Sequence, residues 1–387
     1  MTVFGDYIQG DALESIARGE QGDAAYHSLE LLVGLARAFH APHLIPVSSV
    51  QISGVSFWNL GLEGLEYLET LAIDGRVRVP ATLNPAAFNP KAPPAGVSHS
   101  DVENQARVVA AYGAMGVDTT LTCAPYLWGN LPRFHSHIAW SESSAVVFAN
   151  SVIGAMTNRE GGPAALAAAL TGYAPYYGLH LMENRAPHIV VHVHTALSGA
   201  LEFGLLGAAI GQRTREIPFI ILAGGQSEPL TEDLQALGAA LITFGGAPMF
   251  HMESITPESL HFPVPTRTLE VTAGDLAAVH ESLSSPGEKP QLVLLGCPHY
   301  GPSKMAALSR LPLDIEGLSI GTAASCNTLS CGGLRGGCAA VAPLPSGVNR
   351  IATNSVKAAF YLKNRGVSIE LLSEAQCLAL GNRSEEP

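Results

Sequence analysis

Short apolar runs rich in β-branched residues alternate with stretches of helical spacing along most of the chain. The runs predict strands at 44–47, 76–80, 118–122, 189–193, 218–222, 291–295, 350–353 and 368–371. Between them, apolar residues recur at i, i+3 and i+4, which predicts helices at 61–72, 101–115, 143–156 and 273–283. This alternation favours mostly parallel sheets covered by helices, so the predicted fold class is α/β.

Helix-capping residues and loop-forming residues mark the boundaries of some of these elements. Thr231, followed by Glu232 and Asp233, is a typical helix start. The segment 89–97 is a proline-rich loop, and 326–338 contains too many glycines for a regular element, which indicates a loop where backbone or ligand approaches closely.

Length and composition narrow the class of protein. With 387 residues, the chain should fold as two or three packed lobes, and we expect rough boundaries near 130 and 285. Hydrophobic residues make up 47% and charged residues only 14%, which predicts extensive internal and subunit-interface burial. No apolar run reaches the roughly 20 residues that span a bilayer, and the start lacks signal-peptide features. A cytoplasmic protein is therefore expected.

Charge and cysteine content exclude further classes. The formal net charge is −12, and the 21 Lys and Arg residues are dispersed, which argues against nucleic-acid binding. Six cysteines in a long chain without a visible secretion signal indicate reduced thiols, a metal site or catalysis. The nucleotide-binding motifs GxGxxG and Walker A are absent, as are HExxH and GxSxG.

Three cysteines stand at the ends of predicted strands or beside the glycine-rich loop. Cys123 and Cys297 each follow an apolar strand, and Cys338 lies at the loop edge. Because ligands collect outside the carboxyl ends of parallel strands, these thiols could together hold iron with one position open for substrate. The alternative is that each is a small buried hydrophobe. Cys326, Cys331 and Cys338 could instead form a local metal site.

Other polar groups offer candidates with equally ordinary explanations. His192 and His194 point to one face of a strand and could bind metal, although a hydrogen-bonded surface pair is the simpler interpretation. Glu142, among serines 141, 143 and 144, suits either helix capping or substrate recognition. Arg159 could grip a carboxylate or pair with Glu160.

Read together, several strings resemble the catalytic region of the aconitase X family. They run in family order and cover 44–56, 76–85, 121–127, 137–152, 157–162, 177–180, 296–299 and 352–358. The resemblance implies an aconitase-like α/β/α architecture of several lobes with a cleft between them. It also implies a dehydratase (hydro-lyase) with an iron–sulfur cluster or mononuclear iron.

Site residues also follow from this resemblance. It implies that the metal ligands are Cys123, Cys297 and Cys338, and that substrate is contacted by Gly54, Val55, Ser56, Asn84, Pro85, Asn354 and Ser355. Glycine in the first of these loops allows a ligand to approach the backbone. Proton removal is expected from Ser355, with Lys357 nearby to lower its pKa, or alternatively from Glu142.

The chain departs from the family pattern in two places. The region before Cys338 is shorter than usual, and the family's Asp-Thr is replaced by Gly336 and Gly337, so Cys326 and Cys331 compete for the role of third ligand. The family's small swivelling domain is also missing, which implies a small subunit on a separate chain.

The substrate is expected to be a small hydroxy acid. We favour cis-3-hydroxy-L-proline, because no basic residues cluster around the predicted substrate loops to bind the phosphate of the alternative, mevalonate 5-phosphate. Backbone amides can also bind phosphate, which weakens that preference. An alternative of another class is a non-catalytic binding or scaffold subunit that has lost the cluster.

Overall fold

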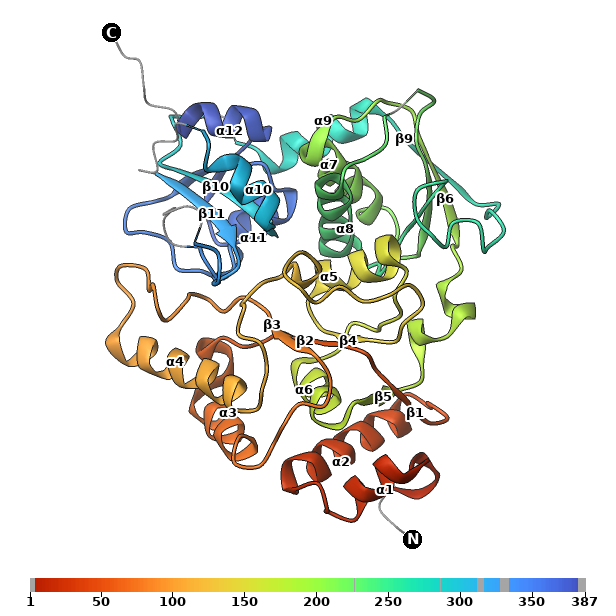
Figure 1. Cartoon of the computed structure of the whole chain (residues 1–387). Coiled ribbons are helices and arrows are strands. Elements are labelled where there is room, and N and C mark those ends of the chain that lie inside the picture. Colours follow the sequence, from red (N-terminus) through yellow and green to blue (C-terminus); the bar gives the residue numbers. More distant parts are fainter. Residues whose placement is uncertain (1–3, 226, 286, 312–316, 328–333, 382–387) are drawn as a thin grey trace.

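The structure is a computed structural model that describes residues 4–225, 227–285, 287–311, 317–327 and 334–381. It consists of three α/β lobes (Figure 1). The first contains helices α1 (Asp11–Ala17), α2 (Asp23–Ala38), α3 (Phe57–Leu71), α4 (His99–Ala114), α5 (Ser143–Phe148) and α6 (Gly162–Thr171) and strands β1 (Leu44–Pro46), β2 (Val50–Ile52), β3 (Ala81–Leu83), β4 (Ala139–Trp140) and β5 (Tyr173–Pro175). Strands β3-β2-β4 form a parallel sheet, and β1 pairs antiparallel with β5.

The second and third lobes each contain a four-stranded parallel sheet. The second comprises β6 (Ile189–Val193), α7 (Gly199–Gly211), β7 (Pro218–Ile221), α8 (Thr231–Gly245), β8 (His251–Met252), β9 (Thr268–Val271) and α9 (Ala273–Leu283). The third comprises β10 (Leu292–Tyr300), α10 (Pro302–Leu308), β11 (Leu318–Thr322), β12 (Arg350–Thr353), α11 (Val356–Asn364), β13 (Ser368–Leu371) and α12 (Glu374–Gly381). The strand orders are β8-β7-β6-β9 and β11-β10-β12-β13. The predicted α/β class with mostly parallel sheets is confirmed.

Helices α7 and α8 run side by side through the second lobe because glycines let their backbones approach. A Cβ on Gly207 would lie 2.3 Å from the carbonyl oxygen of Leu237, and one on Gly211 would lie 2.8 Å from the amide nitrogen of Gly245. Around this pair, apolar side chains of α5, α9 and α11 join one continuous core that reaches from the first lobe to the third. The lobe boundary expected near 285 lies between α9 and β10, and the one expected near 130 lies inside the first lobe, before β4.

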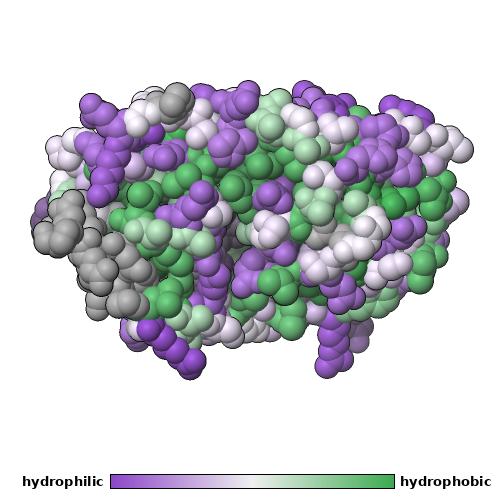
Figure 2. Space-filling model, turned by 90° about the horizontal axis from the view of Figure 1, so that it is seen from above, coloured by the Kyte–Doolittle hydropathy of each residue, from purple (hydrophilic) through white to green (hydrophobic). Residues whose placement is uncertain are grey.

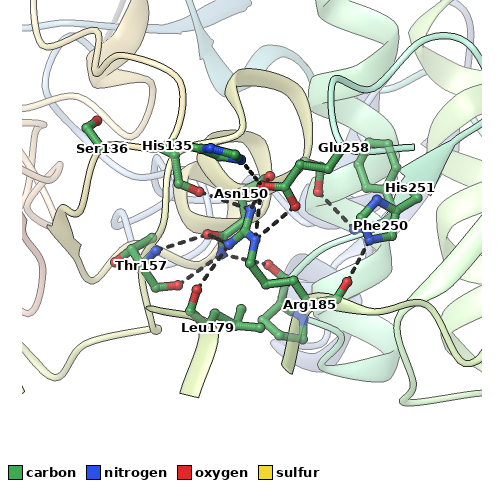
Figure 3. A network of polar contacts seen from close by, with 12 residues as sticks. His135, Ser136, Asn150, Thr157, Leu179, Arg185, Phe250, His251 and Glu258 are labelled. Atoms are coloured by element: carbon green, nitrogen blue, oxygen red, sulfur yellow. Dashed lines mark hydrogen bonds and ion pairs between the residues drawn. The ribbon is translucent and has the colours of Figure 1, made fainter. Parts of the chain in front are cut away.

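A buried arginine joins the first lobe to the second (Figure 3). Arg185, at the end of the short helix η5 (Met182–Arg185), is fully buried and forms an ion pair with Glu258 at 2.9 Å. Its guanidinium also donates to the side-chain oxygen of Asn150 and to three backbone carbonyls. The backbone carbonyl of Arg185 accepts a hydrogen bond from His251 on β8. Because all three guanidinium nitrogens of Arg185 are engaged, the buried charge is compensated, and these contacts hold the first and second lobes together.

Most predicted elements are present, but two predicted strands are wrong. Residues 76–80 form no ladder, because the amides of Val77 and Arg78 donate to two different segments, at Met115 and Ala169. Residues 118–122 form only one bridge, from Asp118 to Thr82, and Leu121 has a left-handed φ of 50°. In the region predicted as a helix at 143–156, the α-helix ends at residue 148 and is followed by a short π-helix, η3 (Ala149–Ile153). No helix of the described residues is long and apolar enough to cross a membrane.

Candidate active site

Loops after three parallel strands of the first lobe meet at one edge of its sheet. Gly54–Ser56 follows β2, Asn84 and Pro85 follow β3, and Glu142 follows β4. The register pairs Val50 with both Ala81 and Ala139, so these strands end level with one another. The carboxyl edge of a parallel sheet is where α/β proteins bind ligands.

Gln51, in the middle of β2, ties these loops together. Its side-chain nitrogen donates to the side-chain oxygen of Asn84 at 3.1 Å, and its side-chain oxygen accepts from the backbone N–H of Glu142 at 2.9 Å. The side chain is fully buried. Gln51 was not predicted from the sequence. Its position between two apolar strand residues, Val50 and Ile52, could have identified it, because a buried amide needs hydrogen-bond partners.

The Gly54–Ser56 loop leads directly into α3. Gly54 has a φ of 77°, which favours glycine, and nothing lies within 4 Å of the position of its missing Cβ. Gln105 on α4 fixes the loop by donating to the carbonyl of Val55 and accepting from the N–H of Phe57. Ser56 occupies the N-cap position of α3, yet its buried hydroxyl has no hydrogen-bond partner. A polar ligand at this helix terminus would satisfy that hydroxyl.

A buried ion pair joins the first lobe to the third at this edge. The ammonium of Lys357, in the first turn of α11, lies 2.8 Å from a carboxylate oxygen of Glu142, and both side chains are at most 10% exposed. Glu142 also caps α5 by accepting from the N–H of Ala145 at 2.6 Å, and it accepts from the hydroxyl of Ser144 at 2.7 Å. The expectation that Glu142 caps a helix is therefore confirmed, and the same carboxylate has a second partner that the sequence did not predict.

The pair is charged on both sides. Burial alone would raise the pKa of Glu142, but Lys357 and the hydrogen bonds from Ser144 and Ala145 outweigh burial and hold it below its ordinary value. Burial alone would lower the pKa of Lys357, but Glu142 and the thiols of Cys297 and Cys123 raise it. A carboxylate held in this way is a poor proton acceptor, whereas the ammonium is a permanent cation at the centre of the site.

The three candidate thiols all respond to this cation. Burial is the main cause of a raised pKa in each, and the Cys297 pKa rises to about 11, while Lys357 lowers all three. Cys297 raises the pKa of Cys123, and Cys338 raises the pKa of Cys297. Within the described ranges, no three His, Cys, Asp or Glu side chains are arranged as a site for one metal ion. The thiols thus converge on a common region without closing around a single point.

One of the thiols is also oriented by a hydrogen bond. The backbone N–H of His299 donates to the sulfur of Cys123 at 3.2 Å. The hydroxyl of Ser355 lowers the pKa of Cys297, and the backbone of the turn after Cys338 lowers the pKa of that thiol. Such donors stabilise a thiolate, the form that binds metal.

The third lobe supplies a small pocket next to these thiols. Cys297, Ser355, Lys357 and Asn354 line one side of it, and α8 of the second lobe lines the other. Ser355 caps α11, where its hydroxyl accepts from the N–H of Ala358 at 3.0 Å. Asn354 donates to the hydroxyl of Tyr300, which in turn donates to Glu374 of α12. Four of the predicted residues therefore line one pocket, Cys297, Asn354, Ser355 and Lys357, whereas Cys338 does not line it. Tyr300 and Glu374 are additional members that were not predicted from the sequence.

The competing cysteines lie elsewhere or outside the described residues. Cys326 is buried in a separate apolar cluster with Met305 and Ile320. Cys331 falls outside the described residues. Of the two described candidates for third ligand, Cys338 has its pKa lowered by Lys357, whereas Cys326 packs in that apolar cluster.

The hydrogen bonds and ion pairs of the described residues link neither the histidine pair nor Arg159 to Lys357, Glu142 or the thiols. His194 pairs with Glu270 at the surface, and its ring stacks on that of His192, which agrees with the simpler interpretation of that pair. Arg159 is exposed, and among the ion pairs of the described residues it has none with Glu160.

Glu160 gives a test of this electrostatic picture. Its side chain is buried, one oxygen has no hydrogen-bond partner, and burial raises its pKa to about 7 from 4.5. A carboxyl with a raised native pKa stabilises the fold at low pH, and this contribution is lost as pH rises from about 4.5 to about 7. We expect Glu160→Gln to gain about 3 kcal/mol over the wild type across this interval, from about 1.4 kcal/mol per pKa unit. Denaturant unfolding from pH 4.5 to 8 measures this difference in stability between variant and wild type. For the control Glu103→Gln, at an exposed position, the difference should not change with pH.

Comparisons with known proteins show which family the chain resembles over its length. Two family models match, "Aconitase X first domain" over residues 10–183 and "Aconitase X second domain" over 187–281. The chain is 37% identical over 381 residues to the phosphomevalonate dehydratase large subunit of Thermococcus kodakarensis, covering 92% of this chain and 95% of that protein. It is 34% identical over 320 residues to cis-3-hydroxy-L-proline dehydratase of Pseudomonas aeruginosa, covering 77% and 53%. The crystal structure of Thermococcus kodakaraensis aconitase X (holo-form) matches with a TM-score of 0.84 at 34% identity, covering 97% of this chain and all of that one.

Proposed function

The chain belongs to the aconitase X family, and we propose that it is the large, catalytic subunit of a dehydratase that removes water from mevalonate 5-phosphate. The family resemblance inferred from the sequence strings is confirmed, and the relatives named above place the chain among the hydro-lyases. The observation that carries the proposal is the buried Lys357 ammonium, which pairs with Glu142 after β4 and lowers the pKa of the three thiols Cys123, Cys297 and Cys338.

The choice of substrate changes from the one favoured by the sequence. The chain covers 95% of a phosphomevalonate dehydratase large subunit but only 53% of a hydroxyproline dehydratase. No basic residues cluster around the predicted substrate loops. The loop Gly54–Ser56 offers a neutral donor instead, the buried hydroxyl of Ser56, which has no hydrogen-bond partner and can bind a phosphate oxygen. Cis-3-hydroxy-L-proline remains the second candidate because that relative shares 34% identity.

The donor set suits iron. Three convergent thiols are the ligands that iron–sulfur clusters use, and His299 Nδ1 is a further buried polar atom without a hydrogen-bond partner. Because Cys thiolates are the usual ligands of iron–sulfur clusters, we favour a cluster over mononuclear iron. Cys123, Cys297 and Cys338 would hold it. When bound, the iron supplies a Lewis acid that makes hydroxide a better leaving group.

The protein's own residues would bind the substrate and move the proton. Backbone N–H groups of Gly54–Ser56 bind an anionic end of the substrate, and Gln51 holds the Asn84 amide in position to donate or accept. Lys357 stabilises negative charge that develops beside it. Ser355 is the better proton acceptor, because Glu142 is already engaged by Lys357, Ser144 and Ala145. Glu142 would then act by holding Lys357 in place.

A small subunit would complete the site. The matched archaeal relative is named a large subunit, so a second chain is implied for that protein, and we propose one here. On the face that Figure 2 shows, apolar residues lie among polar ones, and a partner that covers this face would bury them.

The proposal is tested by assay with and without a small partner co-purified from the native host. We expect the two-chain complex to dehydrate mevalonate 5-phosphate and the isolated large chain to be poorly active. Turnover of cis-3-hydroxy-L-proline alone would shift the assignment to that substrate. Inactivity of the complex on both compounds, with no iron bound, would favour the non-catalytic scaffold.

A further inference from the structure

His299 makes contact with the segments that carry all three thiols. It follows Cys297 by two residues on β10, and its backbone N–H donates to the sulfur of Cys123 at 3.2 Å. Its ring nitrogen Nε2 donates to the carbonyl oxygen of Gly337 at 3.0 Å, directly before Cys338. The residue is 3% exposed, so these bonds are shielded from water.

The two residues directly before Cys338, Gly336 and Gly337, have no side chains, and the nearest described side chain, Arg335, donates to the carbonyl of Cys326 rather than to this point. Gly336 has a φ of 71°, and a Cβ there would lie 2.8 Å from the Cβ of Ala324, so the backbone is packed too closely for a larger residue. The segment is held by backbone bonds instead, from Gly336 N to Thr322 O in the third lobe and from Cys338 N to Ala86 O in the first. The carbonyl of Gly337 is left for the ring of His299.

The ring itself is confined. The position of a Cβ on Gly321 would lie 3.1 Å from the ring carbon Cδ2 of His299 and 2.2 Å from the carbonyl oxygen of Gly296. Glycine at this position on β11 therefore leaves the space that the imidazole occupies. A side chain so enclosed cannot adopt another rotamer without moving β10 or β11.

We propose that His299 is a positioning residue that brings the Cys338 thiol into register with those of Cys123 and Cys297, by donating from Nε2 to the Gly337 carbonyl. The inference rests on the proposed iron-binding role of the thiols. The His299 side chain would thus connect Cys297 on β10 with Cys338 after the glycine-rich loop. Outer partners of metal ligands commonly act in this way, and their loss weakens metal binding.

Two substitutions separate the hydrogen bond from the volume of the ring. Glutamine places its amide nitrogen near the position of Nε2, so His299→Gln should keep the bond to Gly337. Asparagine places its amide near Nδ1, so His299→Asn should lose it. His194→Asn at the surface is the control, because that ring lies outside the site.

The first readout is the alkylation rate of each cysteine in the iron-free chain, followed by mass spectrometry. We expect Cys338 of His299→Asn to react about tenfold faster than in the wild type, the value for one net hydrogen bond, and His299→Gln to restore the slow rate. The second readout is iron and sulfide content after reconstitution, which should fall in His299→Asn and recover in His299→Gln.

Equal Cys338 reactivity and equal iron in the wild type and His299→Asn would overturn the inference. A wild-type chain that binds no iron would instead count against the proposed function, so the two failures are distinguishable. If both variants fail to fold, a measurement on the wild-type chain tests the proposed bond. With ¹⁵N-labelled histidine, the Nε2 proton of His299 should exchange slowly with solvent, and a freely exchanging proton would contradict the proposed bond.

Discussion

Replacement of Lys357 by methionine is expected to destabilise the protein by about 3–5 kcal/mol and to remove its activity. The substitution keeps the length of the side chain but leaves the Glu142 carboxylate buried without its cation, and a broken buried pair costs about this much. The double variant Lys357→Met, Glu142→Gln removes both charges and should recover most of the stability. It should not recover activity, because the cation beside the thiols is still missing.

Denaturant unfolding of the iron-free chain measures the first effect, since no metal then contributes to stability. Arg267→Met is the matched control, because Arg267 pairs with Glu216 at the surface, where an ion pair contributes at most about 1 kcal/mol. Equal losses in Lys357→Met and Arg267→Met would contradict the account of a buried, mutually dependent pair. So would a double variant that is no more stable than the single one.

The parts of the fold that the sequence predicted well are those with strong local patterns. The strand bounds at 189–193, 350–353 and 368–371 and the helix at 273–283 match the structure residue for residue. These are buried parallel strands rich in β-branched residues and a helix with a capping box at Thr272. Short strands such as β2 and β4 escaped prediction, because two or three residues between polar loops carry no periodicity.

Two of the helices that were missed, α6 and α7, share a physical cause. Helices α6 and α7 are apolar on nearly every face, because they are buried on all sides between sheets and other helices. Such helices lack the polar face that makes helical spacing visible. Their glycines and alanines, which weaken a helix prediction, are the residues that allow α7 to contact α8 closely.

In the candidate site, too, local features could be predicted from the sequence and long-range contacts could not. Residues within one segment, such as the cap formed by Glu142, could be anticipated from local pattern. The pairing of Glu142 with Lys357 could not, because the two residues are far apart in the sequence and meet only when the first and third lobes pack together. Gln51 and His299 were also missed, because each acts through contacts with distant backbone or side-chain groups.

The thiols provide the second large effect. Cys123→Ser, Cys297→Ser and Cys338→Ser should each lose bound iron and at least about a hundredfold in activity, since even outer partners of metal ligands contribute 10–100-fold. Cys326→Ala should retain both, because Cys326 lies in a separate apolar cluster. Cys377→Ala is a second control; alanine is used because Cys377 is fully buried, so a serine hydroxyl there would lack water.

Iron and sulfide per chain, measured on these variants after purification without oxygen, test the central claim most directly. The account predicts iron together with sulfide in the wild type, in Cys326→Ala and in Cys377→Ala, and neither in the three serine variants. Full iron retention in Cys123→Ser and Cys297→Ser, or loss of iron in Cys326→Ala with retention in Cys338→Ser, would contradict it.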